Sequence, residues 1–448
     1  MKKIGMVGTG YVGLVTAACL AELGHRVVAY DTDRRKIGLL RKGEVPIFEP
    51  GLATLVSRNV GLGRLTFAAN LDDAVADADA VFIAVGTPSR PTDGEADLSF
   101  VYEAAGEIAE RLFHSCVVVC KSTVPVGTNR EILQRLRLRR PTLAIEVASN
   151  PEFLREGSAI SDFMQPDRVV IGTESEVAKQ VLAGIYHPLG LTASKMLYTG
   201  LESAELIKYA ANAFLATKLS YINEIADLCE RVGANVSDVA AGVGLDKRIG
   251  PNFLQAGPGF GGSCFPKDTR ALLSTARDAG VPLQIVAAVA GVNEQRKAAM
   301  AGRIVAALGG SVVDKVVTVL GVTFKPNTDD MREAPSLAII PALQAAGASI
   351  RAHDPEGMEA AARHLTAIAW FDDAYHASVG ADAIVILTEW DDYVGLDLAR
   401  LKQLMRGRAF IDLRNVYNPD LVAAAGFEHF SVGRPASLVS EAAQDAAA

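Results

Sequence analysis

Cysteine is scarce in this chain of 448 residues, and its spacing excludes two common kinds of site. The five cysteines are odd in number, and no two of them form a C-x-x-C pair: Cys19, Cys116, Cys120, Cys229 and Cys264. A disulfide framework and a zinc cage both need paired or clustered cysteines, so neither fits. Free thiols are typical of a reducing compartment, and we therefore expect a cytoplasmic protein.

Positive charge is also in short supply. The 44 lysines and arginines are outnumbered by 52 acidic residues, the formal net charge is −8, and no basic run stands out. A nucleic-acid-binding protein needs such a run to neutralise phosphates, so the composition argues against this class. An anionic ligand would instead be held by a few placed cations and by backbone amides.

Membrane-spanning runs are missing as well. The uncharged stretch between Lys3 and Glu22 superficially resembles a signal peptide, but glycines interrupt it. No other segment is typical of a membrane span. We therefore expect no membrane association.

The sequence does contain short β-branched runs that alternate with helical stretches. Four apolar runs predict strands buried on both faces of a parallel sheet: 3–7, 26–30, 80–85 and 117–121. Residues 201–233 are rich in alanine and leucine, lack proline and end at Gly233. They predict one helix of about nine turns, about 50 Å long, which suits a connector between domains or a dimer seam.

The region after about Val312 repeats the first in outline. Residues 316–320 and 349–352 predict strands, 336–346 predict a helix, and 381–388 echo 78–85. We therefore expect an α/β protein with two Rossmann-like, doubly wound domains joined by a long central helix and a helical middle region. The domain boundaries are expected at 1–200, 201–300 and 301–448, with fraying from about residue 436.

A glycine-rich turn follows the first predicted strand. Gly8, Gly10 and Gly13 have the G-x-G-x-x-G spacing and precede a helix, an arrangement that holds a dinucleotide pyrophosphate. Asp31 ends the second strand, where a carboxylate accepts ribose hydroxyls and repels the extra phosphate of NADP. The sequence therefore predicts NAD as cofactor, although the basic residues around Lys36 would partly offset that repulsion.

The second α/β region has no comparable glycine pattern. Its first strand is followed by one glycine, Gly321, and by Lys325. A full dinucleotide site is therefore not expected there, whereas a contact from Lys325 to a nucleotide phosphate is.

Cys264 lies in the run 257–268, which has four glycines in its first six positions. Glycine loses the most entropy on ordering, so this run indicates backbone brought close to a ligand. A cysteine just before a helix, expected over 269–280, gains thiolate character from the helix N-terminus, and Lys267 would help. Asp268 is close enough to orient a water or an ammonium. The other four cysteines lie among apolar residues and are expected to be buried.

Polar clusters occur on the long predicted helix and after two strands. Lys208 and Asn212 are spaced i, i+4 and share a helix face. The alternative is a solvated stripe in which Glu205 pairs with Lys208. The clusters 121–125 and 150–157 follow predicted strands, and the carboxyl ends of parallel strands are where ligands bind in such sheets.

These blocks are similar to those of the UDP-glucose/GDP-mannose dehydrogenase family. The resemblance runs from the Gly8 turn to residues 411–414, and the blocks around Thr123, Glu152, Lys208, Cys264 and Lys325 occur in the family's order. It implies an NAD-binding domain in 1–200, a central helical dimerisation region with the catalytic cysteine in 201–300, and a nucleotide-sugar (UDP) domain in 301–448. It also implies a homodimer formed through the long helix.

The resemblance further implies a four-electron oxidation of a nucleotide sugar at C6, from alcohol to carboxylate, with two NAD in succession. Cys264 would carry a thiohemiacetal and then a thioester, while Lys208 would stabilise the oxyanions. Asp268 and Thr123 would hold a water, and Glu152 would activate water for hydrolysis. Asn212 completes the implied catalytic set.

The family positions also imply binding residues. Those implied for the cofactor are Gly8, Gly10, Tyr11, Val12, Gly13, Asp31, Lys36, Thr87, Ser122, Thr123, Glu156, Lys267 and Arg332. Those implied for the substrate are Glu152, Phe153, Leu154, Glu156, Lys208, Asn212, Arg248, Phe253, Phe260, Gly261, Lys325 and Arg414. The arginine at position 248 would reach the substrate of the other subunit, and no metal is expected.

Several alternatives remain open at this point. Gln255 stands where some family members carry a lysine near the uridine, so GDP-mannose or a UDP-N-acetylhexosamine competes with UDP-glucose as the expected substrate. A hydroxyacid-type dehydrogenase, which transfers one hydride, would need no cysteine. A non-catalytic NAD-binding protein would keep Asp31 with no reason to keep Cys264.

Overall fold

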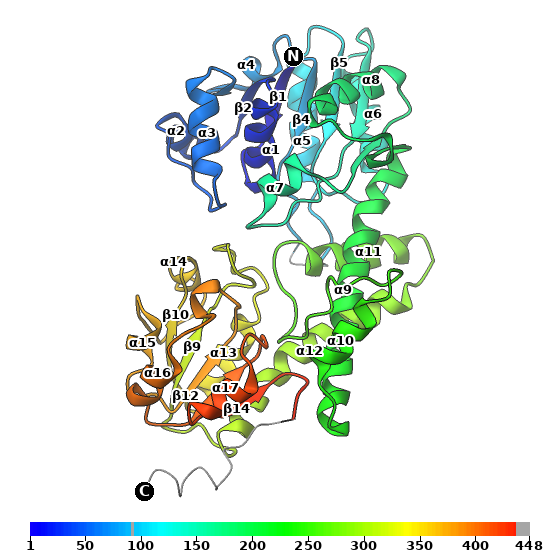
Figure 1. Ribbon diagram of the computed structural model, residues 1–448. Coiled ribbons are helices and arrows are strands. Elements are labelled where there is room, and N and C mark those ends of the chain that lie inside the picture. The colour runs from blue at the N-terminus through cyan, green and yellow to red at the C-terminus, as the bar shows by residue number, and fades with distance from the viewer. Residues whose placement is uncertain (91–93, 436–448) are drawn as a thin grey trace, which may run out of the picture. The chain divides into compact units, whose positions relative to one another are not determined.

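The computed structural model describes residues 1–90 and 94–435 (Figure 1). They form two compact units along the chain. The first is Met1–Ala211 with Arg270–Val281, and the second is Asn212–Thr269 with the residues from Pro282 onward. The fraying expected from residue 436 falls outside the described residues.

The first unit is built on an eight-stranded sheet with the order β3-β2-β1-β4-β5-β6-β7-β8. All neighbouring strands are parallel except β6 and β7. The strands are β1 (Lys3–Val7), β2 (Arg26–Tyr30), β3 (Leu65–Phe67), β4 (Ala80–Ile83), β5 (Cys116–Cys120), β6 (Ile145–Ser149), β7 (Val169–Gly172) and β8 (Met196–Thr199). The strands expected at 3–7 and 26–30 are confirmed to the residue. The strand expected at 80–85 ends two residues earlier, and that expected at 117–121 lies one residue earlier.

Helices cover both faces of this sheet, because successive strand residues point to opposite sides. In β4, Ala80 and Phe82 pack into one core, and Val81 and Ile83 into the other. The first core includes residues of α1 (Tyr11–Glu22), α2 (Arg34–Arg41), α3 (Leu52–Gly61), α7 (Ala159–Met164) and α8 (Glu176–Tyr186). The second includes residues of α4 (Leu71–Val75), α5 (Ser99–Arg111) and α6 (Thr128–Arg139).

The second unit contains a six-stranded parallel sheet with the order β11-β10-β9-β12-β13-β14. Its strands are β9 (Val316–Leu320), β10 (Ser349–His353), β11 (Ile368–Trp370), β12 (Ala383–Ile386), β13 (Ala409–Asp412) and β14 (Glu428–Ser431). One face packs against α10 (Val236–Gly244), α12 (Gln284–Ala307), α13 (Ser336–Ala345) and α14 (Met358–Ala361). The other packs against α15 (Ala374–Ala377), α16 (Leu398–Leu404) and α17 (Pro419–Ala424). The expected pair of doubly wound domains is confirmed.

Helix α9 (Leu201–Val232), drawn in green in Figure 1, is one continuous helix as predicted. Helix α11 (Phe265–Asp278) instead begins four residues before the predicted start at 269. Pro266 lies in its first turn, where the missing amide hydrogen needs no helical carbonyl, so proline does not delay the helix. Cys264 therefore directly precedes the first helical turn.

The remaining short elements are 3₁₀ turns: η1 (His187–Leu189), η2 (Ala193–Lys195) and η3 (Asp391–Tyr393). Among the described residues, no helix is both long and apolar enough to cross a bilayer.

Candidate active site

The glycine turn after β1 leaves open space in front of helix α1. Gly8 has φ of +100°, and a Cβ there would lie 2.5 Å from the Ala84 carbonyl oxygen. A Cβ on Gly13 would lie 2.0 Å from the Gly8 carbonyl oxygen, whereas one on Gly10 would meet nothing within 4 Å. The fold thus requires Gly8 and Gly13, and Gly10 leaves room at the positive end of α1. This cradle fits a dinucleotide pyrophosphate.

Asp31 is fixed beside the same turn. Its Oδ2 accepts hydrogen bonds from the Thr9 amide at 2.7 Å and the Thr9 hydroxyl at 3.0 Å, and its Oδ1 accepts from the Asp33 amide at 2.9 Å. The carboxylate remains partly exposed. Neutral donors hold it without cancelling its charge, so it fits the ribose hydroxyls of NAD better than the phosphate of NADP. Lys36 follows in the first turn of α2.

Glu49 is a buried carboxylate that the sequence patterns did not identify. It accepts a hydrogen bond from the Tyr11 hydroxyl, and its two oxygens accept the amides of Gly157 and Ala159, both at 2.7 Å. It thereby joins the start of α1 to the loop 150–158, which carries Phe153, Leu154 and Glu156. Burial and the Glu49 carboxylate raise the pKa of Tyr11 above its ordinary range, so its hydroxyl stays a donor. Only the contacts across the fold reveal this role.

The loops after β4 and β5 are tied together. The Thr87 hydroxyl donates to the Thr123 carbonyl at 3.0 Å, and the Ser122 hydroxyl donates to the Val85 carbonyl at 2.7 Å. Both loops lie at the carboxyl ends of parallel strands, and β4 is the direct neighbour of β1, which carries the glycine turn. The structure therefore brings together these predicted positions in the first unit.

Glu152 and Lys208 form a buried ion pair at 3.0 Å, with side chains 5% and 4% exposed. The other Glu152 oxygen accepts the Leu154 amide at 2.6 Å, and Lys208 Nζ lies 5.3 Å from the Phe153 ring centroid. Removing two charges from water costs several kcal/mol per ion before their attraction is counted, so such a pair is weak evidence for stability. The pair is therefore a candidate for catalysis rather than a source of stability.

The alternative in which Glu205 pairs with Lys208 on a solvated stripe is wrong. Glu205 instead accepts the Gly127 amide at 2.6 Å and the Asn129 amide at 2.7 Å, at the N-terminus of α6. Burial raises the pKa of this carboxyl. Lys208 and Asn212 are both buried, so the face that they share is not a solvated surface.

Lys121 adds a second buried cation to the first unit. Its Nζ donates to the Asn150 Oδ1 at 3.1 Å and to the Tyr186 hydroxyl oxygen at 3.4 Å. Burial lowers its pKa to about 8, with an opposing effect from Glu152 and a reinforcing one from Lys208. The sequence placed Lys121 in a polar cluster but did not distinguish it as buried.

Cys264 lies at the start of α11 and is partly exposed, whereas the other four cysteines are buried. Burial raises the thiol pKa of Cys19 and of Cys116 to about 12, which keeps them protonated. The Asp268 amide donates to the Cys264 carbonyl at 2.8 Å, so the acid lies one helical turn after the cysteine. The Ser263 hydroxyl lies 3.4 Å from Cys264 Sγ.

Asp268 is held by two partners within the second unit. The Asn212 amide nitrogen donates to its Oδ2 at 2.6 Å, and Lys267 Nζ donates to its Oδ1 at 2.7 Å. The acid is 1% exposed. Asn212 lies on α9, four residues after Lys208 in the chain.

Three aromatic rings pack together at the start of α11. Phe265 packs against Phe253 at 6.0 Å between ring centroids and edge-on against Phe260 at 5.9 Å. Phe253 adopts a positive φ of 63°, uncommon for a bulky residue. Two of the predicted substrate residues are thus placed by contact with Phe265, which was not predicted.

Arg414 draws together loops of the second sheet. Its Nε donates to the Leu387 carbonyl at 2.6 Å, its Nη2 donates to the Phe324 carbonyl at 3.1 Å, and it pairs with Glu389 at 3.0 Å. Lys325 Nζ lies 5.4 Å from the Phe324 ring centroid. Arg414 therefore contacts the backbone of the residue that precedes Lys325 in the chain.

Two predicted arginines are turned toward nearby acids. Arg248 pairs with Asp246 at 2.6 Å, and its side chain is 89% exposed. Arg332 pairs with Asp330 at 2.8 Å. Within residues 1–90 and 94–435, no cluster of three or more histidine, cysteine, aspartate or glutamate residues is arranged to hold a metal ion.

Known proteins match this chain along most of its length. Three domains of one family match in order: the NAD binding domain over 2–190, the central domain over 202–295 and the UDP binding domain over 318–419. The chain belongs to the UDP-glucose/GDP-mannose dehydrogenase family. It is therefore an oxidoreductase whose cofactor is NAD.

Individual members of the family agree with this assignment. The UDP-glucose 6-dehydrogenase of Rhizobium meliloti (strain 1021) is 54% identical over 97% of this chain and 100% of the relative. The structure of a UDP-glucose dehydrogenase from the archaeon Pyrobaculum islandicum has a TM-score of 0.86 at 41% identity, covering 93% of this chain and 95% of that one. That of a UDP-D-ManNAc dehydrogenase from Pyrococcus horikoshii has a TM-score of 0.85 at 26% identity, covering 96% and 99%.

Proposed function

We propose that this protein oxidises the C6 alcohol of UDP-glucose to the carboxylate of UDP-glucuronate. The observation that carries the proposal is the partly exposed Cys264 at the start of α11, with the buried Asp268 one helical turn later. A dehydrogenase that stops at the aldehyde needs no such thiol. The choice of UDP-glucose rests on similarity to the Rhizobium meliloti enzyme at 54% identity.

The cofactor would be held by the Gly8 turn, by Asp31 and by the loops that carry Thr87 and Ser122. When bound there, NAD supplies the acceptor for a hydride from C6. Lys36, Glu156, Lys267 and Arg332 are proposed as further contacts. Asp31 contributes selectivity, because its carboxylate disfavours the additional phosphate of NADP.

Cys264 would act on the aldehyde that the first oxidation produces. Its thiolate sulfur adds to the aldehyde carbon, forming a C–S bond and an oxyanion that takes up a proton to give a thiohemiacetal. The second oxidation removes a hydride and the hydroxyl proton from this adduct, leaving a thioester. The positive end of α11 favours the negative sulfur before attack.

The buried charges would handle oxyanions and water. The Lys208 ammonium stabilises each developing oxyanion in a site without bulk water. Asp268, held by Asn212, orients a water together with Thr123. Glu152 accepts a proton from water that attacks the thioester, whereupon the C–S bond breaks and the Cys264 thiol is restored.

The proposed substrate contacts fall into two groups, one for the sugar and one for the nucleotide diphosphate. Phe153, Leu154, Phe253, Phe260 and Gly261 would hold the sugar, and Lys325 with Arg414 the nucleotide diphosphate. The domain boundaries at 1–200, 201–300 and 301–448 remain our proposal, supported by the three matched segments. Five free thiols support a reducing cytoplasmic setting.

The stoichiometry tests the proposal. The reaction balances as UDP-glucose, two NAD⁺ and water giving UDP-glucuronate, two NADH and three protons. We expect two NADH per UDP-glucose when NAD is in excess and sugar is limiting. One NADH per sugar, or none, contradicts the proposal.

A second sugar is favoured by one observation. The UDP-D-ManNAc dehydrogenase of Pyrococcus horikoshii shares this fold with a TM-score of 0.85. UDP-N-acetylmannosamine therefore belongs in the same assay, together with GDP-mannose. We expect kcat/KM to be highest for UDP-glucose, and a higher value for either competitor reassigns the sugar while leaving the chemistry intact.

We also propose a homodimer formed through α9. Three apolar side chains, Phe214, Tyr221 and Leu228, are 66%, 50% and 55% exposed in the described chain. They recur every seven residues and so form one stripe along the helix, as at a helix–helix seam. A second copy would cover this stripe, and Arg248 of the partner subunit would reach the bound substrate.

Light scattering after size-exclusion chromatography tests the dimer. We expect twice the chain mass for the wild type and monomers for Phe214→Glu/Leu228→Glu. As a matched control, Val60→Glu changes an exposed apolar residue of α3 and should leave the mass unchanged. A wild-type monomer, or an unchanged mass in the double variant, rules out this seam.

A further inference from the structure

Helix α12 buries polar side chains on the face that packs inward. Its buried residues follow helical spacing, but Asn293, Arg296 and Lys297 stand between the apolar Val289 and Met300. Burying unpaired polar groups costs free energy, so each must find a partner. For Asn293 and Arg296 those partners include the backbone of the glycine-rich loop that leads to Cys264.

Asn293 binds both backbone groups of Phe260. Its Oδ1 accepts the Phe260 amide at 2.8 Å, and its Nδ2 donates to the Phe260 carbonyl at 3.0 Å. A side-chain amide used in this way replaces the partners that a neighbouring β-strand would supply. It fixes the direction of the backbone four residues before Cys264.

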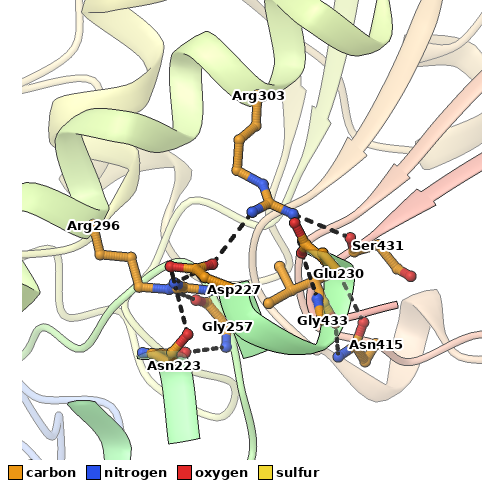
Figure 2. Close-up of polar contacts among 10 residues, drawn as sticks. Asn223, Asp227, Glu230, Gly257, Arg296, Arg303, Asn415, Ser431 and Gly433 are labelled. Carbon is orange, nitrogen blue, oxygen red and sulfur yellow. Dashed lines mark hydrogen bonds and ion pairs between the residues drawn. The ribbon is translucent and has the colours of Figure 1, made fainter. Parts of the chain in front are cut away.

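Gly257 is held in a similar two-sided manner. The Asn223 Oδ1, on α9, accepts its amide at 2.9 Å, and Arg296 Nε donates to its carbonyl at 2.6 Å. Figure 2 shows Asn223 and Arg296 converging on Gly257. Arg296 is itself oriented by both oxygens of Asp227, each at 3.0 Å.

Further polar contacts link α12 and α9 to the residues that follow β14. Arg303 of α12 reaches Asp227 at 3.4 Å and binds Glu230, which accepts the Gly433 amide at 2.6 Å (Figure 2). Glycines let the loop lie directly on α12. A Cβ on Gly259 would come within 2.9 Å of the Lys297 Cγ and 3.1 Å of the Asn293 Oδ1.

The loop also contacts the segment before α13. The Gly262 amide donates to the Arg332 carbonyl at 2.8 Å, and a Cβ on Gly261 would lie 2.2 Å from the Glu333 carbonyl oxygen. The loop therefore contacts side chains of α12 and the backbone of the segment before α13. Its glycines allow close approach, and the α12 side chains determine its position along the helix.

We propose that Asn293, supported by Arg296 and Asn223, is a positioning residue that holds the cysteine loop in its reactive arrangement. It touches no reacting atom. It acts through Phe260 and the following glycines, whose backbone determines the position of Cys264 at the start of α11. This inference rests on the proposed function only for its effect on turnover, because the loop's hydrogen bonding can be measured without any substrate.

The test compares Asn293→Ala with the wild type in two measurements. Hydrogen exchange of the substrate-free protein should speed up at least about tenfold for amides of 257–263, because Phe260 loses its acceptor. In steady-state assays kcat should fall at least about tenfold while the KM for NAD changes less than about twofold, because the Gly8 turn is untouched.

Two further variants separate positioning from general damage. Asn293→Asp keeps the acceptor for the Phe260 amide and should recover most of the exchange protection and part of kcat. Asn59→Ala is the matched control. Asn59 is fully buried in the first unit, where its Nδ2 donates to Glu22 at 2.8 Å and to the Leu55 carbonyl at 2.9 Å. It should leave kcat and exchange in 257–263 unchanged.

The outcomes are distinguishable. Wild-type kcat in Asn293→Ala, or a lowered kcat without faster exchange in 257–263, overturns the positioning role. An equal loss of kcat in Asn59→Ala overturns it too, because destabilisation alone would then explain the effect. Failure of the wild type to oxidise UDP-glucose would reject the proposed function and leave the exchange result to be judged independently.

Discussion

The two sheets build the same turn and use it differently. In the first, the Gly8 amide donates to the Tyr30 carbonyl at 2.8 Å, and in the second the Gly321 amide donates to the His353 carbonyl at 2.9 Å. The acid that follows each second strand accepts the next amide of the turn at 2.7 Å: Asp31 from Thr9, and Asp354 from Val322. Up to this point the two turns are equivalent.

Beyond the turn, the two acids diverge. Asp31 stays partly exposed, whereas Asp354 is fully buried. Asp354 also accepts the Gly357 amide at 2.7 Å and the Trp390 indole N–H at 3.3 Å. Helix α1 begins three residues after Gly8, but after Gly321 no helix of the described chain begins until Ser336. A repeated fold therefore does not repeat its binding site, which depends on a few groups placed upon it.

A second contrast lies at the carboxyl ends of β5 and β6 in the first sheet and of β13 and β14 in the second. By register, Cys120 pairs with Ser149 and Asp412 with Ser431. The residues that follow are Lys121 and Asn150 in the first sheet, and the buried Leu413 and Val432 in the second. The first sheet thus places a hydrogen-bonded ammonium where the second places apolar side chains. A polar pair there is not required by the topology.

Removing the buried acid should have the largest effect. Asp354→Ala leaves several buried donors without an acceptor, so we expect the second unit to lose about 3 to 5 kcal/mol of unfolding free energy. Both tryptophans of the chain, Trp370 and Trp390, lie in this unit, so urea denaturation followed by tryptophan fluorescence reports on it. Asp31→Ala should leave that transition unchanged. Equal losses would remove the contrast between the two acids.

The next largest effect is expected for alanine substitutions of glycines in the two turns, which should differ in their effect on stability. Gly321 has φ of +84°, and a Cβ there would lie 2.5 Å from the Thr388 Cβ, so Gly321→Ala should cost about 2 kcal/mol or more. Gly10→Ala meets no protein atom within 4 Å. It should change stability by less than about 0.5 kcal/mol and yet raise the KM for NAD severalfold. A stable Gly321→Ala, or an unaltered KM in Gly10→Ala, contradicts this account.

Lys121 provides a test by pH. Burial lowers its pKa to about 8 in the folded protein, so the unfolded chain, with an ordinary lysine, binds more protons between about pH 8 and pH 10. Stability should therefore rise with pH through this window, by on the order of 1 to 2 kcal/mol, relative to Lys121→Met. Denaturation at several pH values measures it. The exposed Lys42→Met is the control, and parallel pH profiles for wild type and Lys121→Met would exclude a lowered pKa.

The smallest effect is expected for cofactor choice. Asp31→Ala should weaken NAD binding about tenfold by removing an acceptor for the ribose hydroxyls. NADP binding should change much less, because the lost carboxylate no longer repels its phosphate. Titration with each nucleotide gives the ratio of affinities. Losses of the same size for both would show that Asp31 does not contact the ribose.

Local patterns predicted the fold because its strands are short apolar runs and its turns carry glycine. The strands at 3–7, 26–30 and 316–320 match to the residue, and α9 ends one residue before Gly233. The predicted start of α11 at 269 is four residues too late, because Pro266 is compatible with the first helical turn. The first residue of a helix depends on the backbone geometry at its N-cap, which the amino-acid sequence does not show directly.

The site prediction succeeded where the site has an unusual sequence pattern. It failed where a residue is distinguished only by its burial. Four glycines before Cys264 marked the loop, and the Gly8 spacing marked the cofactor turn. Glu49, Asn293 and Arg296 left no comparable mark, because each acts on backbone groups far away in the chain. On α12, the signal is that polar residues occupy positions on the buried face. The sequence alone does not show which face of α12 is buried.

The central claim is that Cys264 carries the sugar covalently between two oxidations. Glu152→Gln should slow the hydrolysis of the thioester while leaving its formation possible. We predict that acid quenching of this variant during turnover with UDP-glucose and NAD, followed by peptide mass spectrometry, finds the UDP-glucuronyl adduct on the peptide containing Cys264, and that Cys264→Ser lacks it. An unmodified Cys264 in a variant that still produces NADH would contradict the covalent route.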